Sequence, residues 1–325
     1  MEKINHNFKK KFGQNFLTDN NIIVNTVSSV LLQEDDLVIE IGPGSGMLTK
    51  EILKKCRVLA YEIDTDLIDT LSNIPNNEKL TIIWDDFLKR DVIKDIEKFR
   101  YNKLYIIANL PYYITTPIIT KVIESDLDVS KMVIMVQKEV GDRFSSKPGN
   151  KEYGSITVFL NYYFNIKKLF DVSRNCFYPK PNVDSVILML EKKNDTYNVK
   201  DREKLFKLIR DSFSFKRKTI KNNLKGYDLN KIEEVLINNG YSLSSRAEEL
   251  PLDVFIQIAE KNHMIEQITD LQFSRVCRFL GENRYLMRHL LNVKVNLSSL
   301  DLMRNDCSRH FIRIMDAYKI PHNWI

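Results

Sequence analysis

The chain has few cysteines and no long apolar run. Its 325 residues include four cysteines, which lie far apart and form no CxxC pair. A zinc ribbon, another metal site or a redox motif is therefore not expected, and isolated thiols are typical of a chain kept reduced in the cytoplasm. No apolar stretch approaches the roughly 18 residues that a membrane-spanning helix needs, so we expect no membrane span.

The first residues also lack the marks of a targeting segment. Basic side chains occur early, but no hydrophobic stretch follows them, which argues against a secretory signal. The first fifty residues contain no arginine, which argues against a mitochondrial transit peptide. The expectation is a cytoplasmic protein.

The composition is that of an ordinary globular protein. With 43% hydrophobic and 28% charged residues, it excludes a disordered chain, a fibrous repeat and a small disulfide scaffold. The length predicts about two domains. A net charge of +6 suggests a polyanionic partner only where the charge is clustered.

The first half of the chain alternates apolar runs with helical patterns. Near-continuous apolar strands joined by helices predict an α/β, Rossmann-like domain with a mainly parallel sheet covered on both faces. Helices are expected between the strands, for example over Met47–Lys55 and Thr116–Ser125. The seven expected strands are Asp36–Ile41, Arg57–Ile63, Leu80–Trp84, Leu104–Ala108, Lys131–Gln137, Ile156–Tyr163 and Val183–Leu190.

A small all-helical domain is expected after this sheet. The polar stretch Lys192–Lys200 predicts a boundary, which gives a first domain over residues 1–192 and a second over residues 193–263. The second domain has four short amphipathic patterns. They cover Asp201–Ser212, Lys216–Lys225, Leu229–Asn238 and Leu252–Asn262.

The last 62 residues differ in their use of basic residues. Residues 1–263 contain 31 Lys and 9 Arg, whereas residues 264–325 contain 2 Lys and 7 Arg. This shift favours a different origin for a helical C-terminal tail, as a fused module. A chance fluctuation in a helical extension is the alternative. The tail's apolar residues recur at helical spacing over Ile268–Leu280 and Tyr285–Leu291, and its partner is a protein or RNA.

A glycine-rich turn after the first strand indicates a nucleoside-binding site. Gly42 and Gly44 let the backbone turn sharply and approach a ligand closely. Glu62 ends the next strand, 20 residues after Gly42, where a Rossmann-like site places the carboxylate that binds ribose hydroxyls. Glu40, before the glycines, does not fit a dinucleotide and suits a ligand with a positively charged amino-acid end.

Asp86 and Phe87 follow the third strand. Asp86 can accept a hydrogen bond from the exocyclic amine of adenine, and Phe87 can pack on the ring. An ordinary helix N-cap is the other interpretation of Asp86. Its position after the glycines and Glu62 favours the binding role.

The segment Asn109-Leu110-Pro111-Tyr112 ends the fourth strand. Such a segment suits the transfer of a methyl group to an aromatic amine. An amine conjugated to an aromatic ring is a poor nucleophile, because its lone pair is delocalised. It needs acceptors that hold its hydrogens and turn the lone pair toward the methyl donor. The Asn109 side chain and the Leu110 carbonyl can supply them. Pro111 fixes the turn, and Tyr112 offers a face on which a flipped base stacks.

These motifs together resemble the KsgA family of ribosomal RNA small-subunit adenine dimethyltransferases, which use S-adenosylmethionine. The resemblance covers roughly residues 8–263 and follows the family's motif order. The matching segments are Lys10–Leu17, Glu40–Gly46, Glu62, Asp86, Asn109–Tyr112, Val136–Arg143, Tyr153–Gly154, Phe177–Ser185, Lys216–Leu224 and Arg246–Glu248.

The resemblance implies a role for each matching position. Asn15 and Leu17 would contact the methionine and nucleoside ends of the cofactor, and Gly42 its methionine part. Glu62 would bind the ribose and Asp86 the adenine amine. Asn109 would lie where the cofactor methyl meets the target amine. The target adenine would lie between the rings of Tyr112 and Phe177.

Two positions depart from the family pattern, and three other functions remain open. Tyr113 stands where members often have Asn, and Asp85 replaces a small residue. The alternatives are a macrolide-resistance type methyltransferase acting on large-subunit RNA, a DNA adenine methyltransferase, and a non-catalytic RNA-binding assembly factor. The intact site residues argue against lost catalysis.

Basic residues are clustered within the second domain. The segment 213–226 has five of them and no acidic residue, and in a helix Lys218, Lys221 and Lys225 would share one face. Beside a base-methylating site they predict contacts to RNA phosphates. We expect a monomer that acts on small-subunit ribosomal RNA within a ribosomal particle. The proposed RNA contacts are Lys216, Arg217, Lys218, Lys221 and Lys225.

Overall fold

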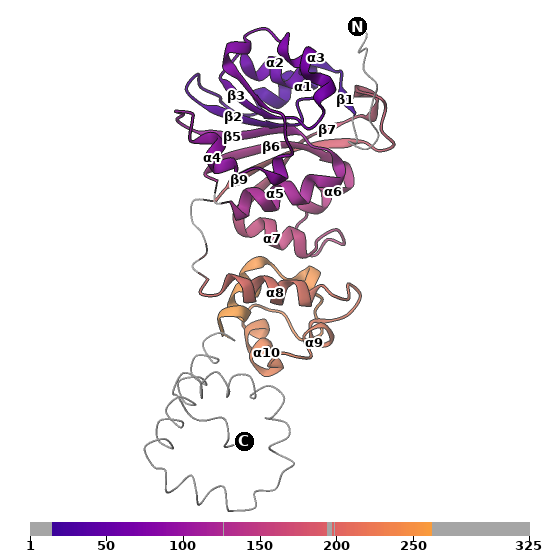
Figure 1. Ribbon diagram of the computed structural model, residues 1–325. Coiled ribbons are helices and arrows are strands. Elements are labelled where there is room, and N and C mark those ends of the chain that lie inside the picture. Colours follow the sequence, from indigo (N-terminus) through magenta and orange to yellow (C-terminus); the bar gives the residue numbers. More distant parts are fainter. Residues whose placement is uncertain (1–14, 126, 194–196, 198, 262–325) are drawn as a thin grey trace, which may run out of the picture. The chain divides into compact units, whose positions relative to one another are not determined.

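The structure, a computed structural model, describes residues 15–261 except for residues 126, 194–196 and 198 (Figure 1). The expected tail over residues 264–325 lies outside the described residues, and so does the start of the motif at Lys10. No helix in the described part of the chain is long and apolar enough to cross a membrane.

The main sheet has seven strands. The first five strands in its spatial order pair with one another in parallel. The penultimate strand in the order runs antiparallel to both its neighbours, so the sheet is mainly parallel, as predicted. Its order is β4 (Leu80–Ile83), β3 (Arg57–Tyr61), β2 (Leu37–Ile41), β5 (Leu104–Asn109), β6 (Val129–Gln137), β9 (Ser185–Lys192) and β7 (Phe164–Val172).

Helices cover both faces of this sheet (Figure 1). Alternate strand residues face opposite sides, so Val38 and Val58 pack with one helical layer and Leu37 and Ile39 with the other. The first layer comprises α1 (Asn20–Ser28), α2 (Met47–Leu53) and α3 (Ile68–Ser72). The second comprises α4 (Val92–Ile96), α5 (Thr115–Glu124), α6 (Lys138–Phe144) and α7 (Ser155–Tyr163).

The predicted strand over Ile156–Tyr163 is wrong, because this segment is helix α7 and the strand β7 follows it. Leu160 packs in the core under the sheet, while Val158 and Tyr162 pack in the core of the helical part. A helix buried on two sides has an apolar run without clear periodicity, which cannot be told from a buried strand. The other six strands are confirmed within a few residues.

The helical part comprises α8 (Arg202–Ser212), α9 (Ile220–Asn223), α10 (Leu229–Asn238) and a helix over residues 252–261. Its core includes Leu205, Ile232 and Phe255, together with the α7 residues named above. Since α7 contributes to both cores, the helical part and the sheet domain belong to one compact unit.

The predicted helix over Lys216–Lys225 is also wrong in its extent. Helix α9 has only four residues, since the Ile220 and Lys221 N–H groups donate to the carbonyls of Ser245 and Leu243 instead of extending a helix. Lys218 therefore precedes the helix and Lys225 follows it. The three lysines named above do not share one helix face.

Candidate active site

The candidate site lies at the carboxyl ends of the parallel strands. The strand order reverses between β2 and β5, since β3 and β4 lie on one side of β2 while β5 lies on the other. Ligands of open α/β sheets bind at such a switch point. One pocket there is lined by residues that follow β2, β3, β4 and β5.

The glycine turn after β2 has the backbone conformation that its sequence predicts. Gly42 and Gly44 have φ values of +71° and +57°, which strain any residue with a Cβ. A Cβ on Gly44 would also lie 2.8 Å from the Phe16 ring. Gly44 is thus required twice, by its own backbone and by the approach of β1 (Phe16–Leu17).

Glu62 is buried at the end of β3, where it lines the pocket. Its Oε2 accepts the N–H of Gly44 at 3.1 Å and its Oε1 accepts the N–H of Asp64 at 2.9 Å. Burial raises the pKa of Glu62, and hydrogen bonds from the backbone at Asp64, Gly44 and Ile63 oppose this rise. The carboxylate is therefore held in one orientation before any ligand arrives.

Glu40 is the most unusual group in the pocket. Its side chain is 1% exposed, and its Oε2 has no hydrogen-bond partner among the described residues. Burial raises the pKa of Glu40 to about 8, and the nearby charge of Glu62 adds to the rise. A buried carboxylate oxygen without a partner is costly unless a ligand completes it, so Glu40 fits a positively charged group.

The loop after β4 places four residues along the pocket: Asp85, Asp86, Phe87 and Leu88. Asp86 caps the short 3-10 helix η4 (Phe87–Lys89), with its Oδ1 accepting the Leu88 N–H at 2.9 Å. The N-cap interpretation is therefore confirmed. The cap uses one carboxylate oxygen, and Asp86 still lines the pocket with the other available to a ligand.

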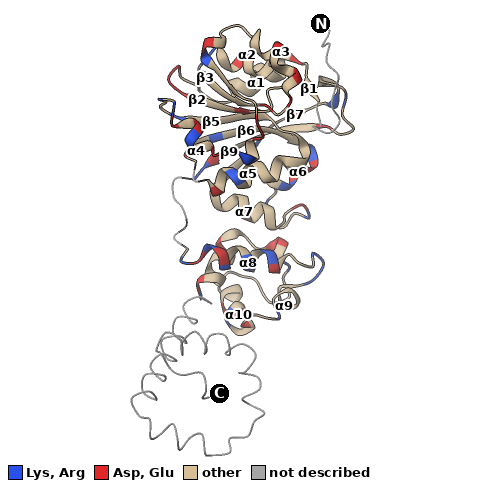
Figure 2. Ribbon diagram, viewed as in Figure 1, with Lys and Arg blue, Asp and Glu red and all other residues tan. Residues whose placement is uncertain are grey.

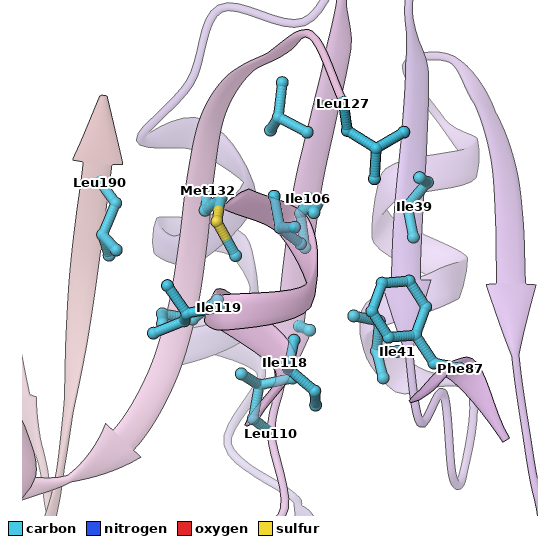
Figure 3. Packing of buried hydrophobic residues seen from close by; sticks show 14 of the residues in the cluster. Ile39, Ile41, Phe87, Ile106, Leu110, Ile118, Ile119, Leu127, Met132 and Leu190 are labelled. Atoms are coloured by element: carbon cyan, nitrogen blue, oxygen red, sulfur yellow. The ribbon is translucent and has the colours of Figure 1, made fainter. Parts of the chain in front are cut away.

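Phe87 is a core residue as much as a pocket residue. It is 3% exposed and meets the Tyr61 ring edge-on at 5.2 Å. Figure 3 shows it beside Ile41, with Ile118 beside Leu110. Phe87 thus forms part of the apolar floor of the pocket and has little exposed ring to cover a base.

Asn109 ends β5 and is tied to the segment before the sheet. Its Nδ2 donates to the carbonyl of Asn15 at 3.3 Å. That segment is anchored in turn, since β1 pairs antiparallel with β8 (Phe177–Tyr178), Leu17 opposite Phe177. The pairing brings Asn15 and Leu17 to the pocket, although they lie far from its other residues in the sequence.

Of the two rings expected to hold the target adenine, Tyr112 lines the pocket and Phe177 does not. The Tyr112 hydroxyl lies 2.8 Å from the Ser185 hydroxyl oxygen, which fixes the ring that lines the pocket. Tyr113, also at the pocket, is 63% exposed. Phe177 is 4% exposed, packs in the core and does not line the pocket.

The pocket therefore brings together every predicted catalytic and cofactor residue except Phe177. Ser185 and Phe16 were missed as supports, because a sequence motif contains them without indicating what they contact. The residues brought together are Asn15, Leu17, Gly42, Gly44, Glu62, Asp86, Phe87, Asn109, Leu110, Pro111 and Tyr112.

Comparison with known families identifies the fold's relatives. The ribosomal RNA adenine dimethylase family matches residues 5–262. The chain belongs to the ribosomal RNA adenine dimethylase family. Membership implies a methyltransferase that acts on ribosomal RNA and uses S-adenosylmethionine, as the motifs predicted. Residues 242–325 match a second family, described as EAL domain, and the two matches overlap over residues 242–262.

Named relatives of this dimethylase chain share much of its sequence. It is 44% identical to the ribosomal RNA small subunit methyltransferase A of Mycoplasma mobile, over 78% of this chain and 97% of the relative. It is 39% identical to the protein of the same name from Clostridium acetobutylicum, over 80% of this chain and 96% of the relative.

Two solved structures show the same fold. One is a dimethyladenosine transferase from Plasmodium falciparum, with a TM-score of 0.61 at 24% identity, covering 75% of this chain and 95% of that one. The other is the 23S rRNA methyltransferase ErmE, with a TM-score of 0.61 at 23% identity, covering 77% of this chain and all of that one. At these identities the likeness concerns the dimethylase fold alone.

Proposed function

We propose that the chain transfers methyl groups from S-adenosylmethionine to the N6 amines of two adjacent adenosines in a hairpin loop of small-subunit ribosomal RNA. The observation that carries this proposal is a shared pocket. The turn at Asn109–Tyr112 lines the same pocket as Glu40, Gly42 and Glu62. A target amine held by the first set of residues would meet a cofactor held by the second.

The residues fit S-adenosylmethionine from end to end. Glu40, buried and lacking a partner at Oε2, suits the positively charged amino group. Glu62 suits the ribose hydroxyls, because a carboxylate has about four lone-pair sites and the backbone N–H groups do not use all of them. Asp86 suits the adenine amine, and Phe87 closes the floor beneath the ring. When bound, the cofactor supplies a methyl group already activated by its sulfonium.

The turn after β5 supplies orientation and needs no strong base. The Asn109 side chain and the Leu110 carbonyl accept hydrogens from the target amine, which turns its lone pair toward the methyl group. Pro111 removes a competing donor. Tyr112, fixed by Ser185, offers a face for the flipped adenine. Phe177 is buried against Leu17, so we assign it to supporting β1 and not to stacking on the target.

RNA would bind on a basic surface that joins the two parts of the chain. The Nζ of Lys216 donates to the carbonyl of Lys151, and the N–H of Gly149 donates to the carbonyl of Glu248 at 2.8 Å. The loop after α6 is thereby fastened to the helical part. Figure 2 shows basic residues along the loop between α8 and α9. The exposed cations of this surface are Lys147, Lys151, Lys216, Arg217, Lys218, Lys221 and Lys225.

This surface suits structured RNA in a ribosomal particle, with the chain acting as a monomer in the cytoplasm. Phosphate contacts give affinity without reading bases, and the pocket supplies the choice of adenine. The relatives named small subunit methyltransferase A are far more similar to the chain than ErmE is, which supports the small subunit as the target.

The test is methyl transfer from labelled S-adenosylmethionine to purified small and large subunits that lack the modification. We expect label on the small subunit alone, mapped to two neighbouring adenines, each dimethylated. Label on the large subunit would favour the macrolide-resistance type of activity. A chain that binds small subunits but transfers no label would be a non-catalytic assembly factor.

A further inference from the structure

Helix α5 reaches the loop that follows β4 through the side chain of Lys121. The helix begins three residues after Tyr112, directly after the short helix η5 (Tyr112–Ile114). Ile118 on α5 lines the pocket, and Lys121 follows it by three residues, on the same helix face. The Lys121 side chain points toward the loop that follows β4.

Lys121 holds that loop by its backbone. Its Nζ donates to the carbonyl of Leu88 at 3.0 Å and to the carbonyl of Arg90 at 2.8 Å. The same Nζ lies 6.0 Å from the centre of the Phe87 ring. A short helix leaves its last carbonyls without intrahelical partners, and a cation at that end satisfies them.

A second set of bonds holds the far side of the loop. Arg90 donates from Nε to Asp95 at 3.1 Å, and the Tyr61 hydroxyl donates to the same carboxylate at 3.2 Å. Arg90 also lies 3.7 Å from the carboxylate of Asp85. These bonds join the loop to β3 and α4, whereas Lys121 joins it to the helix that carries the acceptor turn.

We propose that Lys121 is a positioning residue that sets Asp86 against the cofactor's adenine amine and so gives the site its preference for adenine. This rests on the proposed function, in which Asp86 accepts from that amine. Between Asp85 and Arg90 the regular structure is the short helix η4, and Lys121 adds two hydrogen bonds from α5 to the carbonyls at its end. By gripping two carbonyls, Lys121 keeps Asp86 in register with α5, and therefore with Asn109.

The test compares two ligands that differ only at the adenine amine. S-adenosylhomocysteine carries the amine, and S-inosylhomocysteine has an oxygen in its place. Calorimetry measures both affinities for the full chain and for three variants. Lys121→Met removes the donors at similar length, Lys121→Arg keeps donors, and Lys89→Met is a matched control at an exposed position of the same loop.

We expect Lys121→Met to weaken S-adenosylhomocysteine binding by about tenfold, because a displaced Asp86 loses its charge-assisted hydrogen bond to the adenine amine. Binding of S-inosylhomocysteine should stay nearly unchanged, so the preference for adenine collapses. Lys121→Arg should retain most of that preference, and Lys89→Met all of it. In methyl transfer, the KM for the cofactor should rise while kcat changes little.

An equal loss for both ligands would show a merely structural role and overturn the proposal, as would no loss for either. If Lys121→Met fails to fold, Lys121→Gln replaces it, since its shorter side chain cannot reach both carbonyls. An unchanged adenine preference in Lys121→Gln would equally overturn the proposal. Failure of the unaltered chain to bind either ligand would count against the proposed function instead.

Discussion

Glu62 and Gly44 are joined across the pocket, because the Glu62 Oε2 accepts the Gly44 N–H at 3.1 Å. The bond links the end of β3 to the glycine turn after β2. It aligns the carboxylate with the turn that would hold the cofactor's methionine part. The two motifs that predict a nucleoside site in the sequence thus form one physical unit.

Replacing Glu62 should weaken cofactor binding. Loss of a charged hydrogen-bond acceptor costs about 1.5–3 kcal/mol, so Glu62→Ala should reduce the affinity for S-adenosylhomocysteine by roughly tenfold or more. The matched control is Glu78→Ala, at an exposed position. Unchanged affinity of Glu62→Ala in calorimetry would remove Glu62 from the site.

The pKa of Glu40 predicts a pH dependence of stability. Its pKa rises from 4.5 to about 8 on folding, so between these values the folded chain holds a proton that the unfolded chain has lost. The free energy of unfolding of the ligand-free chain should therefore fall as pH rises through this window. Glu40→Gln should make the fall smaller, with a remainder from Glu62, whose pKa is also raised.

The same carboxyl should release a proton when the cofactor binds. A positively charged amino group favours the ionised form of Glu40 and lowers its pKa. Calorimetry near neutral pH, in buffers of different ionisation enthalpy, should detect this release in the unaltered chain and not in Glu40→Gln. An identical proton balance in both proteins would place the amino group elsewhere.

The sequence predicts the sheet and the glycine site well, because each depends on local pattern. Apolar runs predicted six of the strands correctly. Glu62 follows Gly42 by 20 residues, which is the spacing typical of a Rossmann-like site. The error at α7 has a tertiary cause, since Leu160 and Tyr162 bury against different cores. No local pattern distinguishes a helix with two buried faces from a strand.

The supports of the site could not be predicted, because they depend on contacts far apart in the chain. Lys121 reaches Leu88 across 33 residues, and Tyr112 reaches Ser185 across 73. Phe177 shows the opposite case. A motif contains it and suggests a stacking ring, but its pairing opposite Leu17 buries it.

Asn109 should matter for turnover and not for RNA binding. In the proposed function its side chain orients the target amine during methyl transfer, and loss of one such oriented contact typically lowers the rate by roughly a hundredfold or more. Asn109→Ala should therefore lower kcat and leave the affinity for small subunits near normal. Single-turnover transfer and filter binding measure the two separately. A variant that fails only in binding would contradict this role.

Lys218 and Lys221 should contribute electrostatic affinity. Each phosphate contact adds a slope of about −0.7 to −0.9 to the logarithmic dependence of affinity on salt. Reversing both charges with Lys218→Glu and Lys221→Glu should weaken binding to small subunits and flatten that dependence. The matched control is Lys55→Glu, exposed after α2. An unchanged slope in the double variant would move the RNA surface elsewhere.

The last described helix belongs to the dimethylase part of the chain. Residues 252–261 form a helix whose Val254, Phe255 and Ile258 are buried in the core of the helical part. These residues lie inside both family matches, yet their packing assigns them to the dimethylase. A boundary at His263 leaves this core intact, which supports the proposal that residues 264–325 are a fused module.

A chain truncated after His263 should therefore fold and bind S-adenosylhomocysteine with near-normal affinity, since every residue that lines the pocket precedes the cut. A chain truncated after Leu250 is the matched control. It loses the four buried side chains of the last described helix, Leu252, Val254, Phe255 and Ile258, and removing even one large side chain from a core costs about 2–5 kcal/mol. Thermal unfolding and calorimetry should find the first truncation intact and the second unfolded or strongly destabilised. If the cut after His263 itself abolished folding or binding, residues 264–325 would be an integral part of the enzyme, and the proposed boundary would be wrong.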